Sequence, residues 1–329
     1  MKNNSGNVNQ ELIKQARSEK VKGIYRKYGI FIIFVCMFVI SSLISPNFIR
    51  IDNLVNIVRQ NAAITILACG MTVIIISGSI DLSAGAVLTF SGCLASGVMA
   101  QTNSVILALL VGIASACVME WCNSFIITKF DLPPFIATMA MQNIAKGLVQ
   151  VYTNGTAILG IGSLSKLGSG YAGVVPIPII IMLACIAITF LFLKYTPLGL
   201  YVYSIGGNEK ATTASGVNAK KMMRIFFLIH GVFVGLAGVV LMARLNSGQP
   251  SLASAGYEFD AIVAVIVGGT SFNGGIGSVL GTLIGALIVG MINNILLLLN
   301  IPTMYQFIVK GVLIAGAVIL DVKTRARSK

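Results

Sequence analysis

Two apolar stretches, IPIIIMLACIAITFLFL (residues 177–193) and IFFLIHGVFVGLAGVVLM (residues 225–242), lie on either side of the polar stretch GGNEKATTASGVNAKK (residues 206–221). Each apolar stretch has about the length of a membrane helix, since a hydrocarbon core about 30 Å thick takes roughly 20 residues. The polar stretch contains three lysines and one glutamate. The pattern predicts two membrane helices joined by a bridge that lies outside the lipid.

The whole chain has the composition of these flanking stretches. Of its 329 residues, 56% are hydrophobic and only 10% are charged, and the mean hydropathy is +0.91. A soluble domain carries about 25% charged residues, so this composition excludes one. The apolar runs are continuous rather than alternating, which favours helices over a β-barrel. We therefore expect an all-α, polytopic membrane helix bundle.

About ten membrane helices are expected from the apolar runs. The expected spans are at about 29–45, 61–79, 83–101, 104–127, 135–152, 175–194, 224–243, 258–271, 276–299 and 304–320. The span at 258–271 is the weakest, because it is short and begins with Glu258 and Asp260.

The basic residues predict the orientation of the chain. With ten spans, seventeen lysines and arginines lie on the side of the two termini and four lie on the other side. Basic residues are in excess in cytoplasmic loops, so both termini should be cytoplasmic. The expected domains are basic tails at 1–28 and 322–329 around a transmembrane domain at 29–321. The net charge of +13 is scattered over loops and tails rather than gathered on one face, which does not predict nucleic-acid binding.

Two Gly/Ser-rich breaks, Ser77–Gly85 and Gly268–Gly277, each join one apolar run to the next. Broken helices in corresponding places are typical of a translocation site in transporters. A short turn at the membrane edge is the other interpretation, and both remain open. The two breaks lie six spans apart and run the same way, which does not fit an inverted repeat.

Close helix packing is indicated by glycines spaced four residues apart. Gly277, Gly281 and Gly285 form one such series, and Gly231 with Gly235 forms another. This spacing lets neighbouring backbones approach each other.

The sequence has few groups that could do chemistry. No GxxxxGK[ST] phosphate loop is present, so this chain should not hydrolyse nucleotide. The one histidine, His230, lies in an apolar helix and is interpreted as a packed helix residue. Most carboxylates map to loops or span ends, and Glu120 is the clear interior candidate. The cysteines have no metal-ligand spacing and are interpreted as small core residues. No cofactor or metal site is predicted.

Uncharged polar residues in the spans have two interpretations. They suit a passage for a neutral, hydroxyl-rich solute, or they form hydrogen bonds between helices. The candidates for a translocation path are Asp81, Ser83, Asn143, Asn273, Asn293 and Asn294.

The polar bridge has its own local pattern. Asn208 before a run of helix formers predicts an N-cap, and Gly216 predicts a stop, so that the segment forms a short docking helix. An ordinary inner loop is the alternative on composition alone.

Several motifs in order resemble one family. GNEKATTASGVNAKKM (207–222) is similar to the cytoplasmic loop of the sugar-transport permeases of bacterial ABC importers, the ribose/xylose/galactose group. SGSIDLSAGAV (77–87), LPPFIATMAMQNIAKG (132–147) and the long stretch 243–294 are also similar to family motifs. The resemblance runs from about Ile51 to Asp321. The departures are Lys210, the pair Thr212–Thr213, and SGS in place of GG before IDLS.

The resemblance implies a multi-pass permease of the bacterial inner membrane that imports a monosaccharide, ribose-like, by alternating access. The implied partners are ABC ATPase subunits, a periplasmic or lipid-anchored sugar-binding protein, a second permease copy or close homologue, and membrane lipid. The loop 195–223 would carry the coupling helix. The residues implied to contact the ATPase are Gly207, Asn208, Glu209, Ala214, Ser215, Gly216 and Asn218. The outer segments near 47–60, 153–174 and 244–258 would meet the binding protein.

Two other hypotheses make different demands on the sequence. An autonomous, ion-coupled secondary transporter of a small polar solute would make Glu120 or Asp81 essential. A membrane-embedded enzyme is disfavoured, because no paired carboxylates, metal-spaced residues or nucleophile with a base are evident.

Overall fold

The computed structural model describes residues 29–302, 305, 308–309, 311–312 and 315–316. The two predicted tails, 1–28 and 322–329, lie outside the described residues, and the predicted span at 304–320 is described only in part.

Helices make up most of the described chain, as the composition predicts. The helix Gly29–Ile44 is followed by α2 (Ile51–Ile76), α3 (Ala84–Thr102), α4 (Val105–Phe130), α5 (Pro134–Thr153), α6 (Lys166–Ser169), α7 (Ile177–Tyr195), α8 (Pro197–Ala214), α9 (Ala219–Leu245), α10 (Tyr257–Val267) and α11 (Val279–Leu298). Short 3₁₀ turns, η1 (Gly162–Ser165) and η2 (Pro250–Ser254), and the antiparallel pair β1 (Tyr171–Ala172) and β2 (Val175–Pro176) complete the fold.

Six of the described helices, α2, α3, α4, α7, α9 and α11, are long and apolar enough to cross a membrane. This finding confirms a helical membrane bundle, whereas the number of ten spans stays a prediction. Helix α10 has 11 residues, or about 17 Å at 1.5 Å per residue, and is shorter than the hydrocarbon core. Helix α5 is long enough, but it carries Gln142, Lys146 and Gln150.

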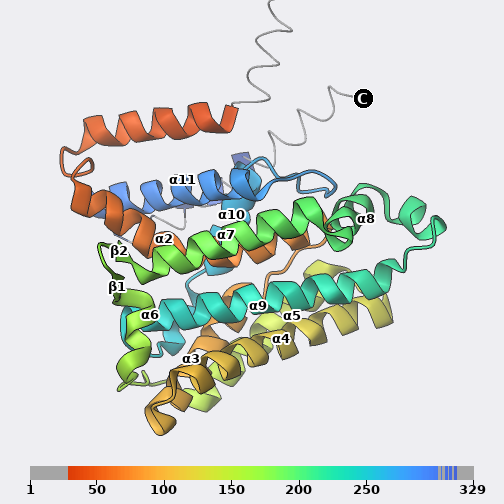
Figure 1. The fold of residues 1–329 in the computed structure, drawn as a ribbon, viewed down its shortest axis with the longest axis horizontal. Helices are drawn as coiled ribbons and strands as arrows, with labels where there is room; N and C mark the ends of the chain where they lie inside the picture. The colour runs from red at the N-terminus through yellow and green to blue at the C-terminus, as the bar shows by residue number, and fades with distance from the viewer. Residues whose placement is uncertain (1–28, 303–304, 306–307, 310, 313–314, 317–329) are drawn as a thin grey trace, which may run out of the picture.

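The long helices form a bundle with a clear inside and outside. Helices α4, α7, α9 and α11 lie roughly parallel, with α8 at one end and the β1–β2 pair at the other (Figure 1). The most apolar window of α2 is 89% buried, while that of α4 is 28% buried. Helices α2 and α9 are therefore central, and α4 presents apolar side chains such as Ile106 and Leu110 outward, as a lipid-facing helix does.

Glycines set the helix contacts in the bundle, as their spacing predicts. A Cβ at Gly231 would lie 2.8 Å from the Cα of Cys117, and one at Gly235 would lie 2.6 Å from the Cα of Ile113, so α9 and α4 touch through their backbones. Gly281 and Gly285 of α11 face the backbone of α10 in the same way. These close contacts confirm the packing role of the two glycine series.

Candidate functional site

The first break separates α2 from α3 and is held by its own side chains. Gly78 has a φ of 84°, in the left-handed region that glycine adopts without steric cost. Asp81 Oδ1 accepts hydrogen bonds from the backbone N of Ser83 at 2.8 Å and from Ser83 Oγ at 2.6 Å. Asp81 thereby fixes the turn that precedes α3.

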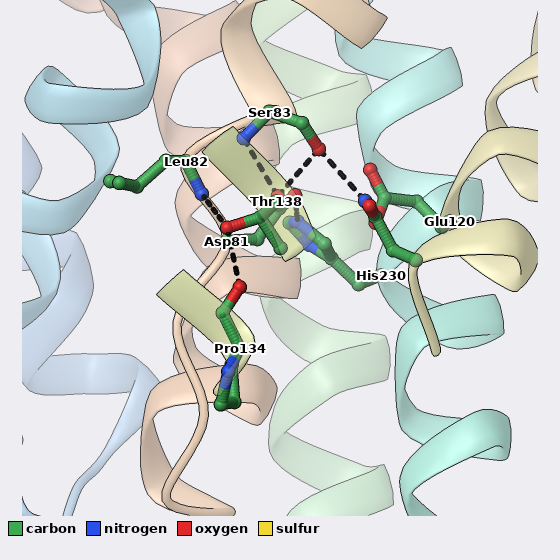
Figure 2. A network of polar contacts seen from close by, with 8 residues as sticks. Asp81, Leu82, Ser83, Glu120, Pro134, Thr138 and His230 are labelled. Carbon is green, nitrogen blue, oxygen red and sulfur yellow. Dashed lines mark hydrogen bonds and ion pairs between the residues drawn. The ribbon is translucent and has the colours of Figure 1, made fainter. Parts of the chain in front are cut away.

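Asp81 and Ser83 belong to a buried polar cluster, which we define as Asp81, Ser83, Glu120, Asn123 and His230 (Figure 2). His230 Nε2 lies 3.1 Å from Asp81 Oδ2. The amide of Asn123 donates to Ser83 Oγ at 2.8 Å and to Glu120 Oε2 at 3.0 Å. All five residues are 0% exposed. The cluster joins the break to α4 and α9 by a continuous hydrogen-bond network.

Helix α5 contacts the same break from another side. The backbone N of Leu82 donates to Thr138 Oγ1 at 3.1 Å, and Thr138 Oγ1 in turn donates to the carbonyl of Pro134 at 2.9 Å (Figure 2). Further along α5, the amide of Gln142 donates to Glu258 Oε1 of α10 at 2.8 Å. Polar groups therefore connect the break, α5 and α10.

Asp81 and Ser83 were candidates for the translocation path on the basis of the sequence, but the sequence did not predict that they belong to a cluster. It treated Glu120 as a lone interior carboxylate and His230 as a packed helix residue. Their positions are 39 and 149 residues from Asp81 in the chain, so no spacing rule connects them. The available signal was that each ionisable group lies in or beside an apolar run, where burial of a charge is costly.

The other path candidates lie elsewhere. Asn143 is exposed and donates to the carbonyl of Met139 in its own helix, and Asn273 is exposed in the second break. Asn294 of α11 exchanges two hydrogen bonds with Asn53 of α2, at 3.0 and 2.9 Å, which is the geometry of a helix-joining pair. Asn293 is half-buried beside it.

The second break, between α10 and α11, meets the first break. The backbone N of Gly275 donates to the carbonyl of Ile76, the last residue of α2, at 2.8 Å. A Cβ on Gly274 would lie 2.9 Å from the Cα of Gly78. The two breaks that the sequence singled out are thus in backbone contact, although about 190 residues separate them.

The polar bridge touches both breaks at the same place. A Cβ on Gly206 would collide with the carbonyl oxygen of Ile76 and lie 2.7 Å from the N of Gly275. A Cβ on Gly275 would lie 2.8 Å from the Cα of Gly207. We call this three-way contact of Gly78, Gly206, Gly207, Gly274 and Gly275 the glycine junction. At Gly206, Gly274 and Gly275, only a residue without a side chain lets the backbones approach this closely.

The bridge itself has the predicted local structure. Helix α8 contains a kink at Asn208, where φ is −162° and ψ is 96°. After the kink, Asn208 Oδ1 accepts from the backbone N of Ala211 at 3.0 Å, which is an N-cap contact. Gly216 has a φ of 90° and ends the segment, and Asn218 caps α9 by accepting from Lys221 N at 2.9 Å.

The predicted ATPase-contacting residues are all at the surface. Each of them is exposed, namely Gly207, Asn208, Glu209, Ala214, Ser215, Gly216 and Asn218. Thr212, between them, is buried, and its hydroxyl donates to the carbonyl of Asn208 in the same segment at 2.9 Å. The segment is a capped, ordered surface helix rather than an irregular loop.

The segments predicted for the outer side are in contact with one another. Ile158 and Gly248 exchange two backbone hydrogen bonds, both of 2.8 Å. Arg59 Nη1 donates to the hydroxyl of Tyr171 at 3.4 Å. This surface lies at the end of the bundle opposite α8 (Figure 1).

Comparison with known proteins agrees with these features. The family model described as "Branched-chain amino acid transport system / permease component" matches residues 53–318. The ribose import permease protein RbsC of Bacillus subtilis (strain 168) is 40% identical over 307 residues, covering 92% of this chain and 95% of that protein. RbsC of Escherichia coli (strain K12) is also 40% identical, covering 89% and 92%.

A third relative, the L-arabinose transport system permease protein AraH of Escherichia coli (strain K12), is 33% identical over 300 residues, covering 91% of each chain. No solved structure matches this chain. The family match spans most of the chain and includes both breaks and the polar bridge. This chain therefore belongs to the branched-chain amino acid transport system / permease component family of membrane permeases.

Proposed function

We propose that this chain is the permease subunit of an ATP-driven importer of a ribose-like monosaccharide in the bacterial inner membrane. It moves the sugar by alternating access and is not itself an enzyme, because ATP is hydrolysed by a separate partner. Relatives named for ribose and for L-arabinose cover about nine-tenths of the chain, which supports a pentose as the substrate.

The glycine junction is the observation that carries the mechanism. The largely exposed segment Asn208–Gly216 presents polar groups to a soluble partner, and Gly206, two residues before it, contacts both helix breaks. A displacement of this segment by an ATPase is thus passed to α2 and to the α10–α11 turn without an intervening side chain. Contacts of this kind can switch between discrete packings more readily than a rigid core deforms.

The opposite end of the bundle suits the sugar-binding protein. Hydrogen bonds link the segment around Ile158 and Tyr171 to Gly248 and to Arg59, and a binding protein can contact the exposed parts of these segments together. We further propose ten spans with both termini cytoplasmic, tails at 1–28 and 322–329 around a permease domain at 29–321, and pairing with a second permease copy among membrane lipids. The excess of basic residues on the inner side supports this topology.

Reconstituted vesicles test the function. Sealed vesicles containing the chain with its ATPase and binding protein should accumulate radiolabelled ribose when the ATPase faces ATP, and a non-hydrolysable ATP analogue should give no accumulation. The chain alone, under a proton or sodium gradient, should give none either. Gradient-driven uptake by the chain alone would establish the autonomous transporter instead. Competition by unlabelled arabinose and ribose ranks the two pentoses as substrates.

A further inference from the structure

Three ionisable side chains from three different elements meet inside the bundle. Asp81 comes from the first break, Glu120 from α4 and His230 from α9, and one potential ligand atom of each lies within 4.8 Å of the other two. All three residues are fully buried. They converge at one point (Figure 2), so any species bound there would contact the break and two membrane helices at once.

The charges of this group are not balanced by its neighbours. When both carboxyls are ionised and the imidazole is neutral, the site holds two negative charges without solvent. Among the described residues, His230 is the only basic side chain that pairs with either carboxylate. Buried charges are normally paired or coordinate a metal ion. A divalent cation supplies the two missing positive charges.

In each carboxylate, one oxygen accepts hydrogen bonds from neighbouring donors, and the second oxygen is not held by those donors. Asp81 Oδ1 takes both bonds from Ser83, which leaves Oδ2 next to His230. Glu120 Oε2 takes the bond from Asn123, while the buried Oε1 has no hydrogen-bond partner. Metal-binding carboxylates are commonly held in this way, with one oxygen fixed by a neighbouring donor.

We propose that Asp81, Glu120 and His230 bind one divalent transition-metal ion of the type of Zn²⁺ or Mn²⁺. Two ligand atoms each about 2.1 Å from one ion lie about 3.0–3.4 Å apart at angles between octahedral and tetrahedral. Asp81 Oδ2 and His230 Nε2 are 3.1 Å apart. The Glu120 side chain has three rotatable bonds, and rotation about them brings a carboxylate oxygen to the same ion as the third ligand. The imidazole nitrogen favours Zn²⁺, and the two carboxylates also suit Mn²⁺, whereas Mg²⁺ and Ca²⁺ prefer oxygen ligands alone.

The bound ion ties the start of α3 to α4 and α9. Asp81 is the residue that fixes the turn before α3 through Ser83, so metal binding stabilises the first break in the geometry described above. The inference depends on these contacts alone and does not depend on which solute is transported.

Metal analysis of the purified full-length chain tests this site. The detergent-solubilised protein is stripped with EDTA, incubated separately with Zn²⁺, Mn²⁺ or Mg²⁺, desalted and analysed by mass spectrometry and thermal unfolding. The expected result is one Zn²⁺ or Mn²⁺ per chain with a rise in melting temperature, and neither with Mg²⁺. Glu120→Gln and His230→Gln should each lose at least tenfold in metal affinity. Glu209→Gln, at an exposed carboxylate, is the matched control and should bind as the wild type does.

Co²⁺ absorption provides a second readout that does not depend on the variants folding. Wild-type protein loaded with Co²⁺ should show the visible bands of an ion bound by nitrogen and oxygen, and Zn²⁺ should displace them. Absence of stoichiometric metal in the wild type overturns the proposal, as does unchanged binding in Glu120→Gln, which would place the metal at another site. A pH-dependent melting temperature that is insensitive to every metal would assign the cluster to proton sharing and also overturn it. None of these results bears on sugar transport, so failure here is distinct from failure of the proposed function.

Discussion

Gly206 occupies the most crowded backbone position of the glycine junction. A methyl group there would meet the carbonyl oxygen of Ile76 and the N of Gly275, both of them main-chain atoms. Main chain cannot rotate away as a flexible side chain does, so one of the three segments has to move. The neighbouring Gly207 is also part of the junction, but a methyl group on it would meet nothing within 4 Å.

We therefore expect Gly206→Ala to lower stability and ATP-driven transport, and Gly207→Ala to leave stability near wild type. Overpacking of this kind costs about 1–3 kcal/mol. Melting temperature in detergent and ribose uptake by the assembled transporter measure the two effects. Gly207→Ala is the matched control, since it adds the same methyl group one residue away. Equal behaviour of the two variants would show that the junction does not transmit motion.

At the level of single residues, the sequence predicted those structural roles that depend only on neighbouring residues in the chain. Asn208 and Gly216 were recognised as a cap and a stop, because both roles follow from the local chain. The contact of Asp81 with His230 was not predicted, because 149 residues separate them. Only the packing of α9 against the first break brings the two side chains together.

The segment after the kink in α8 is the element that faces the proposed ATPase. Its start depends on the Asn208 side chain, which accepts from Ala211 N, and its end depends on Gly216 with a positive φ. Loss of an N-cap costs about 1 kcal/mol. A non-glycine residue in the left-handed region costs roughly 1–2 kcal/mol, and a β-branched residue is strained most.

Asn208→Leu and Gly216→Val should therefore abolish transport while the chain still inserts in the membrane. Asn208→Asp keeps the cap acceptor, and Gly216→Asn tolerates a positive φ, so both should retain most transport. Membrane fractionation followed by blotting measures insertion, and co-purification of the ATPase measures docking. If the Leu and Val variants transported ribose normally, the segment would have no coupling role.

A comparison of helix boundaries shows why some membrane spans were predicted more accurately than others. Expected spans such as 83–101 and 104–127 agree with α3 and α4 to within a few residues, because uninterrupted apolar runs determine both. The span expected at 258–271 ends as a helix at Val267. The residues after it in the expected span are Gly268, Gly269, Thr270 and Ser271, and the two glycines form a turn of the second break. Hydropathy does not distinguish a buried glycine turn from a helix.

The two ends of the molecule are proposed to contact different partners, and their separation leads to a test of the orientation of the chain. The Asn208–Gly216 segment lies at one end of the long helices and the β1–β2 pair at the other (Figure 1). Val174, between the two strands, is 92% exposed, and Lys210 is exposed in the coupling segment. The basic residues Lys194, Lys220 and Arg224 lie in or near the bridge and predict that this end faces the cytoplasm.

Cysteines introduced at these two positions should report opposite sides of the membrane. On a background in which the native cysteines are replaced by serine or alanine, Val174→Cys should react with a membrane-impermeant maleimide added to spheroplasts. Lys210→Cys should react only after the membrane is permeabilised, because the segment has to reach a cytoplasmic ATPase. The cysteine-free parent controls for background labelling. Labelling of Lys210→Cys in intact spheroplasts would put the bridge on the wrong face, and an ATP-driven motor could then not act on the glycine junction.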